Sequence, residues 1–294
     1  MNISFLGEAE QDIEYVHVSL YHELEASALG VPANLQELSQ IASLAPEPIL
    51  SKTGKAYLME GRMGFDVMMD GQVQNSWIIN DFLEYSKPKK EPILEIGSGY
   101  GNIALRALLQ GNIVVANDIS IAQLLQIRNL AQANTLPLEK LYLNDCSFPE
   151  QTAFANNIFS AIMLHRVLHF LNPVQMDEAL AKIGNWLIPG GQVCIVVMAP
   201  QHKDFSNWFL PVYEQRWQAG NNWPGMLKVR KALPEQAYNL PEYLNVMDER
   251  PLRKALENLN FTIVNSGFIS LKSFASKLDD RDGKEAFGII AAKA

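Results

Sequence analysis

The sequence has few cysteines, no long apolar run and no excess of positive charge. Its two cysteines, Cys146 and Cys194, cannot form a disulfide framework and have no partners at metal-ligand spacing. No stretch approaches the ~18 consecutive apolar residues of a membrane-spanning helix. Acids from Glu8 to Glu14 occupy the region where a signal peptide would be apolar. We therefore expect a cytoplasmic protein with no metal site and no insertion into a membrane.

The charge balance excludes one class of partner. The formal net charge is −8 and the sequence pI is about 5.2, so the molecule as a whole repels a phosphate backbone and no nucleic-acid partner is expected. A small molecule or a protein remains as the substrate. The 294 residues, of which 48% are hydrophobic, suffice for one large core with accessory segments. The sequence leaves the oligomeric state open.

The pattern of apolar residues changes near Pro92. Before it, residues 1–30 look helical, prolines and glycines interrupt the chain to Gly71, and a helix is predicted over Ser76–Ser86. After it, short apolar runs alternate with helical periods, which is typical of a parallel sheet covered on both faces. The predicted strands are Ile93–Ile96, Ile113–Asn117, Leu141–Asn144, Ala161–Leu164, Gln192–Met198, Phe261–Leu271 and Phe287–Ala292.

These elements predict an α/β fold with a doubly wound, seven-stranded, mainly parallel sheet and a ligand cleft at the C-terminal ends of the strands. Residues 1–90 form a predicted N-terminal cap of helices and loops. Residues 91–200 and 248–294 form the predicted core, and residues 201–247 are an insertion after the fifth strand. We interpret this insertion as a substrate lid, because it overhangs the mouth of the cleft and its aromatic side chains could serve as walls; a core of paired helices is the alternative.

The segment Leu94–Asn102 is a predicted strand that ends in a glycine-rich turn and continues into a helix. Dinucleotide-binding proteins use G-x-G-x-x-G to seat a pyrophosphate at a helix N-terminus. Here Gly97, Gly99 and Gly101 are followed by Asn, so the third dinucleotide glycine is missing. Glu95 would repel a pyrophosphate, whereas a cationic ligand would be attracted to it.

This arrangement resembles motif I of the class I methyltransferases, in the superfamily of methyltransferase domains 11, 12 and 25. The resemblance implies a Rossmann-like sheet whose last strand is antiparallel, and S-adenosylmethionine (SAM) as the cofactor. It also implies that Glu95 shapes the methionine end of the cofactor pocket, while Gly97, Ser98 and Gly99 line its floor.

Further matches follow in the family's order. Asp118 matches the acid that binds both ribose hydroxyls, and a carboxylate with two acceptor oxygens suits a vicinal diol. Ile119 matches the apolar residue that lies against the adenine. Asp145 matches the side chain that accepts a hydrogen bond from the adenine amine, and Cys146 completes this cofactor-binding set. The fourth-strand motif and the "L-x-P-G-G" turn of the family are matched by Phe159–Leu171 and Leu187–Gly191.

His165 is the candidate catalytic residue. It ends the fourth predicted strand, and a neutral imidazole there could take a proton from a hydroxyl or amine nucleophile. The alternative is that His165 packs on the cofactor or caps the next helix. Upstream, Arg62 could pair with the SAM carboxylate or could be a surface arginine. Ser160 departs from the family, which often has a structural Asp at that position.

The resemblance implies transfer of a methyl group by in-line displacement, which requires alignment, exclusion of water and, for some substrates, removal of one proton. The N-P-P-[Y/F] tetrapeptide of nucleic-acid amino-group methylases is absent after the fourth strand. A small-molecule acceptor is therefore favoured. A protein methyltransferase and a non-catalytic SAM-binding or partner-binding module remain open as alternatives. An NAD-dependent oxidoreductase is disfavoured by Glu95 and by the missing glycine.

Overall fold

The computed structural model describes residues 20, 24, 27–51, 54, 56–59, 64–66, 68, 76–273 and 282–294. Most of the predicted helix over residues 1–30 lies outside these residues, and so does Arg62. The part of the N-terminal region that is described contains several short elements. They are β1 (Val31–Pro32), α2 (Gln36–Ala42), β2 (Tyr57–Leu58), β3 (Phe65–Asp66) and α3 (Trp77–Tyr85).

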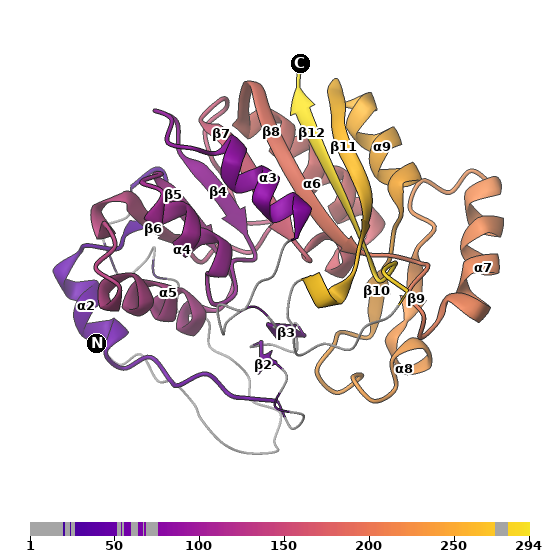
Figure 1. The fold of residues 1–294 in the computed structure, drawn as a ribbon, viewed down its shortest axis with the longest axis horizontal. Coiled ribbons are helices and arrows are strands. Elements are labelled where there is room, and N and C mark those ends of the chain that lie inside the picture. The colour runs from indigo at the N-terminus through magenta and orange to yellow at the C-terminus, as the bar shows by residue number, and fades with distance from the viewer. Residues whose placement is uncertain are drawn as a thin grey trace.

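An eight-stranded sheet forms the centre of the molecule (Figure 1), with the order β1-β6-β5-β4-β7-β8-β12-β11. Strands β4 to β8 are parallel to one another, and β12 is antiparallel to both of its neighbours, β8 and β11. Their bounds are β4 (Ile93–Ile96), β5 (Val114–Asn117), β6 (Leu141–Asn144), β7 (Phe159–His165), β8 (Leu187–Met198), β11 (Phe261–Ile269) and β12 (Ala286–Lys293).

The predicted α/β class is confirmed, and so is the antiparallel last strand. All seven predicted strands are present, and the sheet has one strand more than the sequence predicts. The additional strand is β1, which pairs antiparallel with β6 through Val31 and Leu143. A strand of two residues is too short to show strand periodicity in the sequence. Its proline is tolerated because β1 lies at the edge of the sheet.

Helices cover both faces of the sheet. Along β4, Ile93 is buried against the layer that contains α3, α4 and α5, whereas Leu94 is buried against α6 and α9. This alternation is the expected outcome for a strand with two buried faces. In Figure 1, α3 to α5 lie in front of the sheet and α6 lies behind it. The bounds are α4 (Asn102–Leu109), α5 (Ile121–Ala133), α6 (Pro173–Trp186) and α9 (Glu249–Asn258).

The insertion, residues 201–247, has a hydrophobic core of its own. It contains α7 (Ser206–Gln218), β9 (Met226–Lys228), α8 (Val229–Ala232) and β10 (Tyr243–Asn245). Phe209 and Tyr213 are buried inside this core. Trp223 instead packs with the main core, and its Nε1 donates to Asp177 at 2.8 Å. These three aromatic side chains therefore stabilise the fold and do not form a lid surface.

Candidate functional site

The glycine-rich loop between β4 and α4 brings backbone and neighbouring side chains into close contact. Gly97 has φ +67°, and a Cβ at this position would lie 2.4 Å from Cγ2 of Val167. Gly99 has φ +53°, and its Cβ would lie 3.0 Å from Oδ2 of Asp66 and 3.2 Å from Cε of Met59. L-residues avoid such φ values. The loop therefore depends on glycine for both conformation and space.

Asp118 links the end of β5 to this loop. One carboxylate oxygen accepts from Gly99 N at 2.8 Å, and the other accepts from Ser120 N at 3.0 Å. Ser98 is held from the same side, because its N–H donates to Asn117 O at 2.9 Å and its hydroxyl donates to Glu95 O at 3.0 Å. Three of the predicted cofactor-binding residues, Ser98, Gly99 and Asp118, are thus brought together.

Glu95 lies beneath the loop, with an exposed fraction of 2%. Its Oε2 accepts from Ala104 N at 2.8 Å, in the first turn of α4. Burial raises the pKa of the Glu95 carboxyl well above its usual range; the Ala104 bond opposes this, and the carboxylates of Asp66 and Asp118 add to it. Three acidic side chains therefore surround one short loop.

Asp66 is a site residue that the sequence analysis missed. Its carboxylate accepts from Met68 N at 2.7 Å and from Tyr100 N at 3.2 Å, so β3 is fastened to the glycine-rich loop. Tyr100 also contacts β2. Its hydroxyl donates to Leu58 O at 3.3 Å, and its ring meets the Tyr57 ring edge-on with centroids 6.1 Å apart. No motif identifies Asp66, since its role depends on a contact between segments 34 residues apart.

Asp145 and Cys146 follow the end of β6. Asp145 is fully buried, and its Oδ2 accepts from Leu20 N at 2.7 Å. Cys146 is half-buried, and its carbonyl accepts from Nδ2 of Asn117 at 2.8 Å. The same Nδ2 also donates to Asn144 Oδ1 at 2.9 Å. We did not predict from the sequence that the Asn117 side-chain amide bridges the ends of β5 and β6, although an Asn–Asp pair stands at the end of each of these strands. Ile119, by contrast, is 39% exposed, so an apolar surface is available beside Asp118.

His165 and Arg166 lie at the C-terminal end of β7. His165 is buried, and burial together with the charge of Arg166 lowers its pKa to about 3. Arg166 has φ +65°, which is uncommon for a residue with a side chain. The pKa of Arg166 is lowered by burial and raised by Asp66. The imidazole of His165 is therefore neutral at physiological pH.

Two further buried groups lie beyond this strand end, on the 3₁₀ turn Leu168–Phe170 and on β10. Within the described part of the chain, Nδ1 of His169 and Oδ1 of Asn245 have no hydrogen-bond partner. Asn245 Nδ2 donates to Leu171 O at 3.4 Å, which places the two side chains on adjoining segments. Buried polar atoms normally have partners, so this pair could accept a polar group from a ligand. Asn245 was not foreseen, because no sequence pattern connects β10 to this turn.

The donor set fits SAM better than a dinucleotide. The carboxylates of Asp66 and Asp118 lie against the loop, and they suit a ligand with an ammonium and a sulfonium. A pyrophosphate would be repelled by the same groups. Among the residues that the structure describes, no cluster of three or more His, Cys, Asp or Glu side chains could hold a metal ion. In the same described ranges, no helix is both long and apolar enough to span a membrane.

Comparison with known proteins finds a family model that matches the segment carrying this site. Residues 93–191 match the family model of a methyltransferase domain. These residues run from the start of β4 into β8, so the match covers the glycine-rich loop, Asp118, Asp145 and His165. No curated protein sequence is significantly similar to the chain.

Solved structures with the same fold are numerous. A SAM-dependent methyltransferase from Methanosarcina mazei is 21% identical with a TM-score of 0.54, covering 75% of this chain and 98% of that chain. The 1,6-didemethyltoxoflavin-N1-methyltransferase of Burkholderia thailandensis is 18% identical with a TM-score of 0.52, covering 74% and 77%. Magnesium protoporphyrin IX methyltransferase from Synechocystis PCC 6803 is 12% identical with a TM-score of 0.52, covering 89% and 95%.

The segment from residue 93 to residue 191 thus matches a methyltransferase domain. The chain has the Rossmann-like fold of the solved SAM-dependent methyltransferases.

Proposed function

We propose that the protein methylates a small organic molecule by in-line displacement. The acceptor would lie at the C-terminal ends of the strands, between the β2–β3 hairpin and the insertion. Bound SAM supplies a methyl group that its sulfonium already activates. The protein's own task is therefore to align the acceptor, exclude water and accept a proton where the nucleophile carries one.

One contact favours a small acceptor in particular. Gly64 N, in the segment that joins β2 to β3, donates to Asn239 O of the insertion at 2.9 Å. Leu240 and Phe170 lie against the same glycine, since a Cβ there would be 3.3 Å and 3.7 Å from their side chains. Three segments thus meet beside the strand ends, which restricts access for a folded protein.

The proposed cofactor contacts follow the family match. Asp118 would bind the ribose hydroxyls, Ile119 would pack on the adenine, and Asp145 with Cys146 would border its amine. Asp145 would then have to share its carboxylate with Leu20 N. Arg62, which lies outside the described residues, remains a candidate for the SAM carboxylate.

His165 is the proposed proton acceptor. Its pKa of about 3 keeps the imidazole neutral and able to accept, but it also makes the group a weak base. We therefore expect His165 to orient a hydroxyl or amine nucleophile and to receive its proton as the methyl transfers.

The enzyme can be tested with tritium-labelled SAM and an extract separated into small molecules and proteins. The proposal expects label in the small-molecule fraction. Label confined to protein would identify a protein methyltransferase instead. Label in neither fraction would contradict catalysis and favour a non-catalytic SAM-binding module. Of structurally similar enzymes, those from B. thailandensis and Synechocystis are named for small-molecule substrates.

The cofactor assignment is tested by Asp118→Ala. We expect SAM affinity to fall by roughly 1–3 kcal/mol, because charge-assisted hydrogen bonds to the ligand are lost. Calorimetric titration with SAM, S-adenosylhomocysteine and NAD measures the change. The matched control is Asp81→Ala, which removes an exposed carboxylate from α3. Equal SAM affinity in wild type and Asp118→Ala would remove Asp118 from the site, and binding of NAD would contradict the choice of cofactor.

A further inference from the structure

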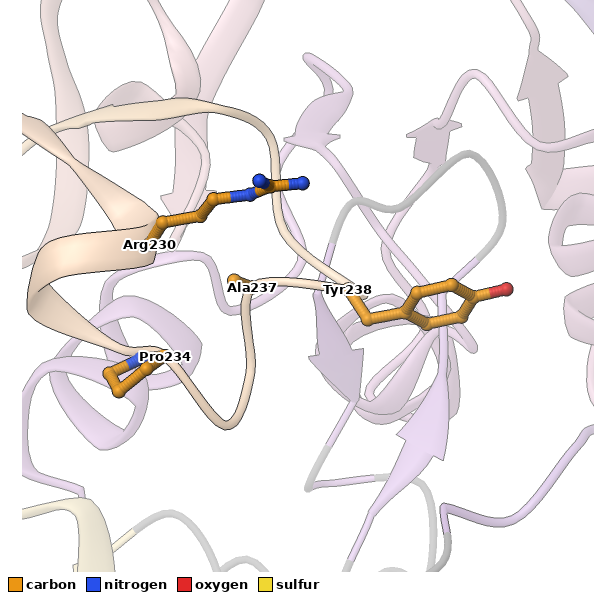
Figure 2. Close-up of a pocket in the computed structure, with 4 residues that line it drawn as sticks. All are labelled: Arg230, Pro234, Ala237 and Tyr238. Atoms are coloured by element: carbon orange, nitrogen blue, oxygen red, sulfur yellow. The ribbon is translucent and has the colours of Figure 1, made fainter.

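A pocket lies in the insertion, away from the glycine-rich loop. Its cavity volume is about 360 Å³, and Arg230, Pro234, Ala237 and Tyr238 line it (Figure 2). Small-molecule sites in proteins span roughly 300–1,000 Å³, so the pocket is large enough for a compact organic ligand. In Figure 2, the side chains of Arg230 and Tyr238 extend from the insertion toward the same side.

Arg230 differs from the cations beside it. Lys228 forms an ion pair with Glu242 at 3.3 Å, and Nζ of Lys231 lies 4.1 Å from the centre of the Trp208 ring. For Arg230, no hydrogen bond or ion pair is found within the described ranges, and the residue is exposed. A planar guanidinium can bind a carboxylate through two parallel hydrogen bonds. The pocket therefore offers an unpaired cation in a molecule whose net charge is −8.

The remaining walls suit a flat, apolar body. The Tyr238 side chain is 69% exposed, and Pro234 and Ala237 are apolar. A tyrosine ring provides a large rigid surface at a low cost in side-chain entropy, and other aromatic groups stack on it favourably. Arginine and an exposed aromatic ring in one pocket match a ligand that has an anionic end and a planar remainder.

The pocket is structurally connected to the cofactor site. Its wall continues from Tyr238 to Asn239, whose carbonyl accepts from Gly64 N. Gly64 O in turn accepts from Met59 N at 3.1 Å, and Met59 packs beside Gly99 of the glycine-rich loop. Met59 and Gly64 thus connect the wall of the pocket to the glycine-rich loop.

We propose that this pocket binds the carboxylate of a small, planar, acidic acceptor, with Arg230 as the carboxylate ligand and Tyr238 as the stacking surface. The assignment of this ligand as the methyl acceptor rests on the proposed function. Binding of the carboxylate itself does not, because it requires neither SAM nor turnover.

The test uses cinnamate as the probe and its uncharged analogue cinnamamide as the comparison. Both are titrated into wild type, Arg230→Gln and Lys231→Gln, with and without S-adenosylhomocysteine, by ligand-observed NMR. Lys231→Gln is the matched control, because it removes the same charge one residue away from the pocket. We expect cinnamate to bind wild type and Lys231→Gln equally, and to bind Arg230→Gln about tenfold more weakly, as expected for the loss of hydrogen bonds to a charged group.

Three outcomes would overturn the proposal. They are no saturable binding of cinnamate to wild type, equal affinity for wild type and Arg230→Gln, and cinnamamide binding as well as cinnamate. Failure of the proposed function is measured separately. If no methyl transfer is found but cinnamate binding depends on Arg230, the carboxylate pocket stands while the small-molecule methyltransferase does not.

Discussion

His165 and Arg166 show how burial determines what a single side chain can do. Both lie at the carboxyl end of β7, where the strand leaves the sheet beside the glycine-rich loop. The pKa of His165 is lowered to about 3, first by burial and then by the charge of Arg166. A histidine in this environment is present as neutral imidazole at physiological pH, so it can accept a hydrogen bond there.

For His165→Gln we expect turnover to fall by about tenfold to a hundredfold while SAM affinity stays the same, because the base contributes to the chemical step alone. Stopped-time assays with labelled SAM, together with calorimetry, separate the two quantities. The control is His202→Gln, a buried histidine that stacks on Phe205 with ring centroids 5.1 Å apart. If both variants lose turnover equally, the effect is one of packing and His165 is not the base.

Among the elements, α7 and α9 are joined by a network of side chains. Asp248 is the N-cap of α9, where its carboxylate accepts from Arg250 N at 3.1 Å. The same carboxylate accepts from the hydroxyl of Tyr213, on α7, at 3.0 Å. Arg250 also binds both oxygens of Glu214 at 2.8 Å and 2.6 Å. One helix of the insertion is thereby fixed to a helix of the core.

Asp248→Ala should lower the free energy of unfolding by about 2–3 kcal/mol, because it removes a helix cap and leaves the buried Tyr213 hydroxyl without an acceptor for its proton. Urea unfolding followed by circular dichroism measures the change. The exposed pair Lys228–Glu242 provides the control, and Glu242→Ala should cost less than about 1 kcal/mol. Equal losses in the two variants would show that the α7–α9 network contributes no more than an ordinary surface pair.

For the whole molecule, the buried histidines make stability depend on pH. The pKa of His165 is lowered to about 3, and that of His169 is lowered well below its usual value. The unfolded chain therefore binds protons near pH 6.5 that the folded protein does not. The contribution of these two neutral histidines to stability is present above pH 6.5 and is lost as the pH falls toward 3. Glu95 acts in the opposite direction, because its pKa is raised in the folded state.

A comparison of wild type with His165→Gln isolates one of these groups, because Glu95 and His169 are common to both. Between pH 6 and pH 4, the free energy of unfolding of wild type should fall more steeply, by about 1.4 kcal/mol per pH unit. Chemical unfolding at several pH values measures both slopes. Parallel curves for the two proteins would mean that His165 is protonated in the folded state, contrary to its lowered pKa.

The sequence by itself determined the succession of strands and helices along the chain and the glycine-rich loop after β4. The sequence suffices for these features because strand and helix periodicities are local patterns. Glu95, Gly97 and Gly99 also lie close together in the sequence. Asp118 could also be predicted from the sequence, because it follows directly after the next predicted strand. The short strand β1 was not, because two residues carry no periodicity.

Only the tertiary structure decided which distant side chains complete the site. Asp66 reaches the glycine-rich loop across 34 residues, and Leu20 N reaches Asp145 across 125. Asn245 meets the turn after β7 only because the insertion folds back on a core of its own. The neutral state of His165 likewise follows from burial, which depends on packing between segments. Such contacts have no local pattern, so the glycine-rich loop could be predicted from the sequence, whereas the side chains that distant segments bring to it could not.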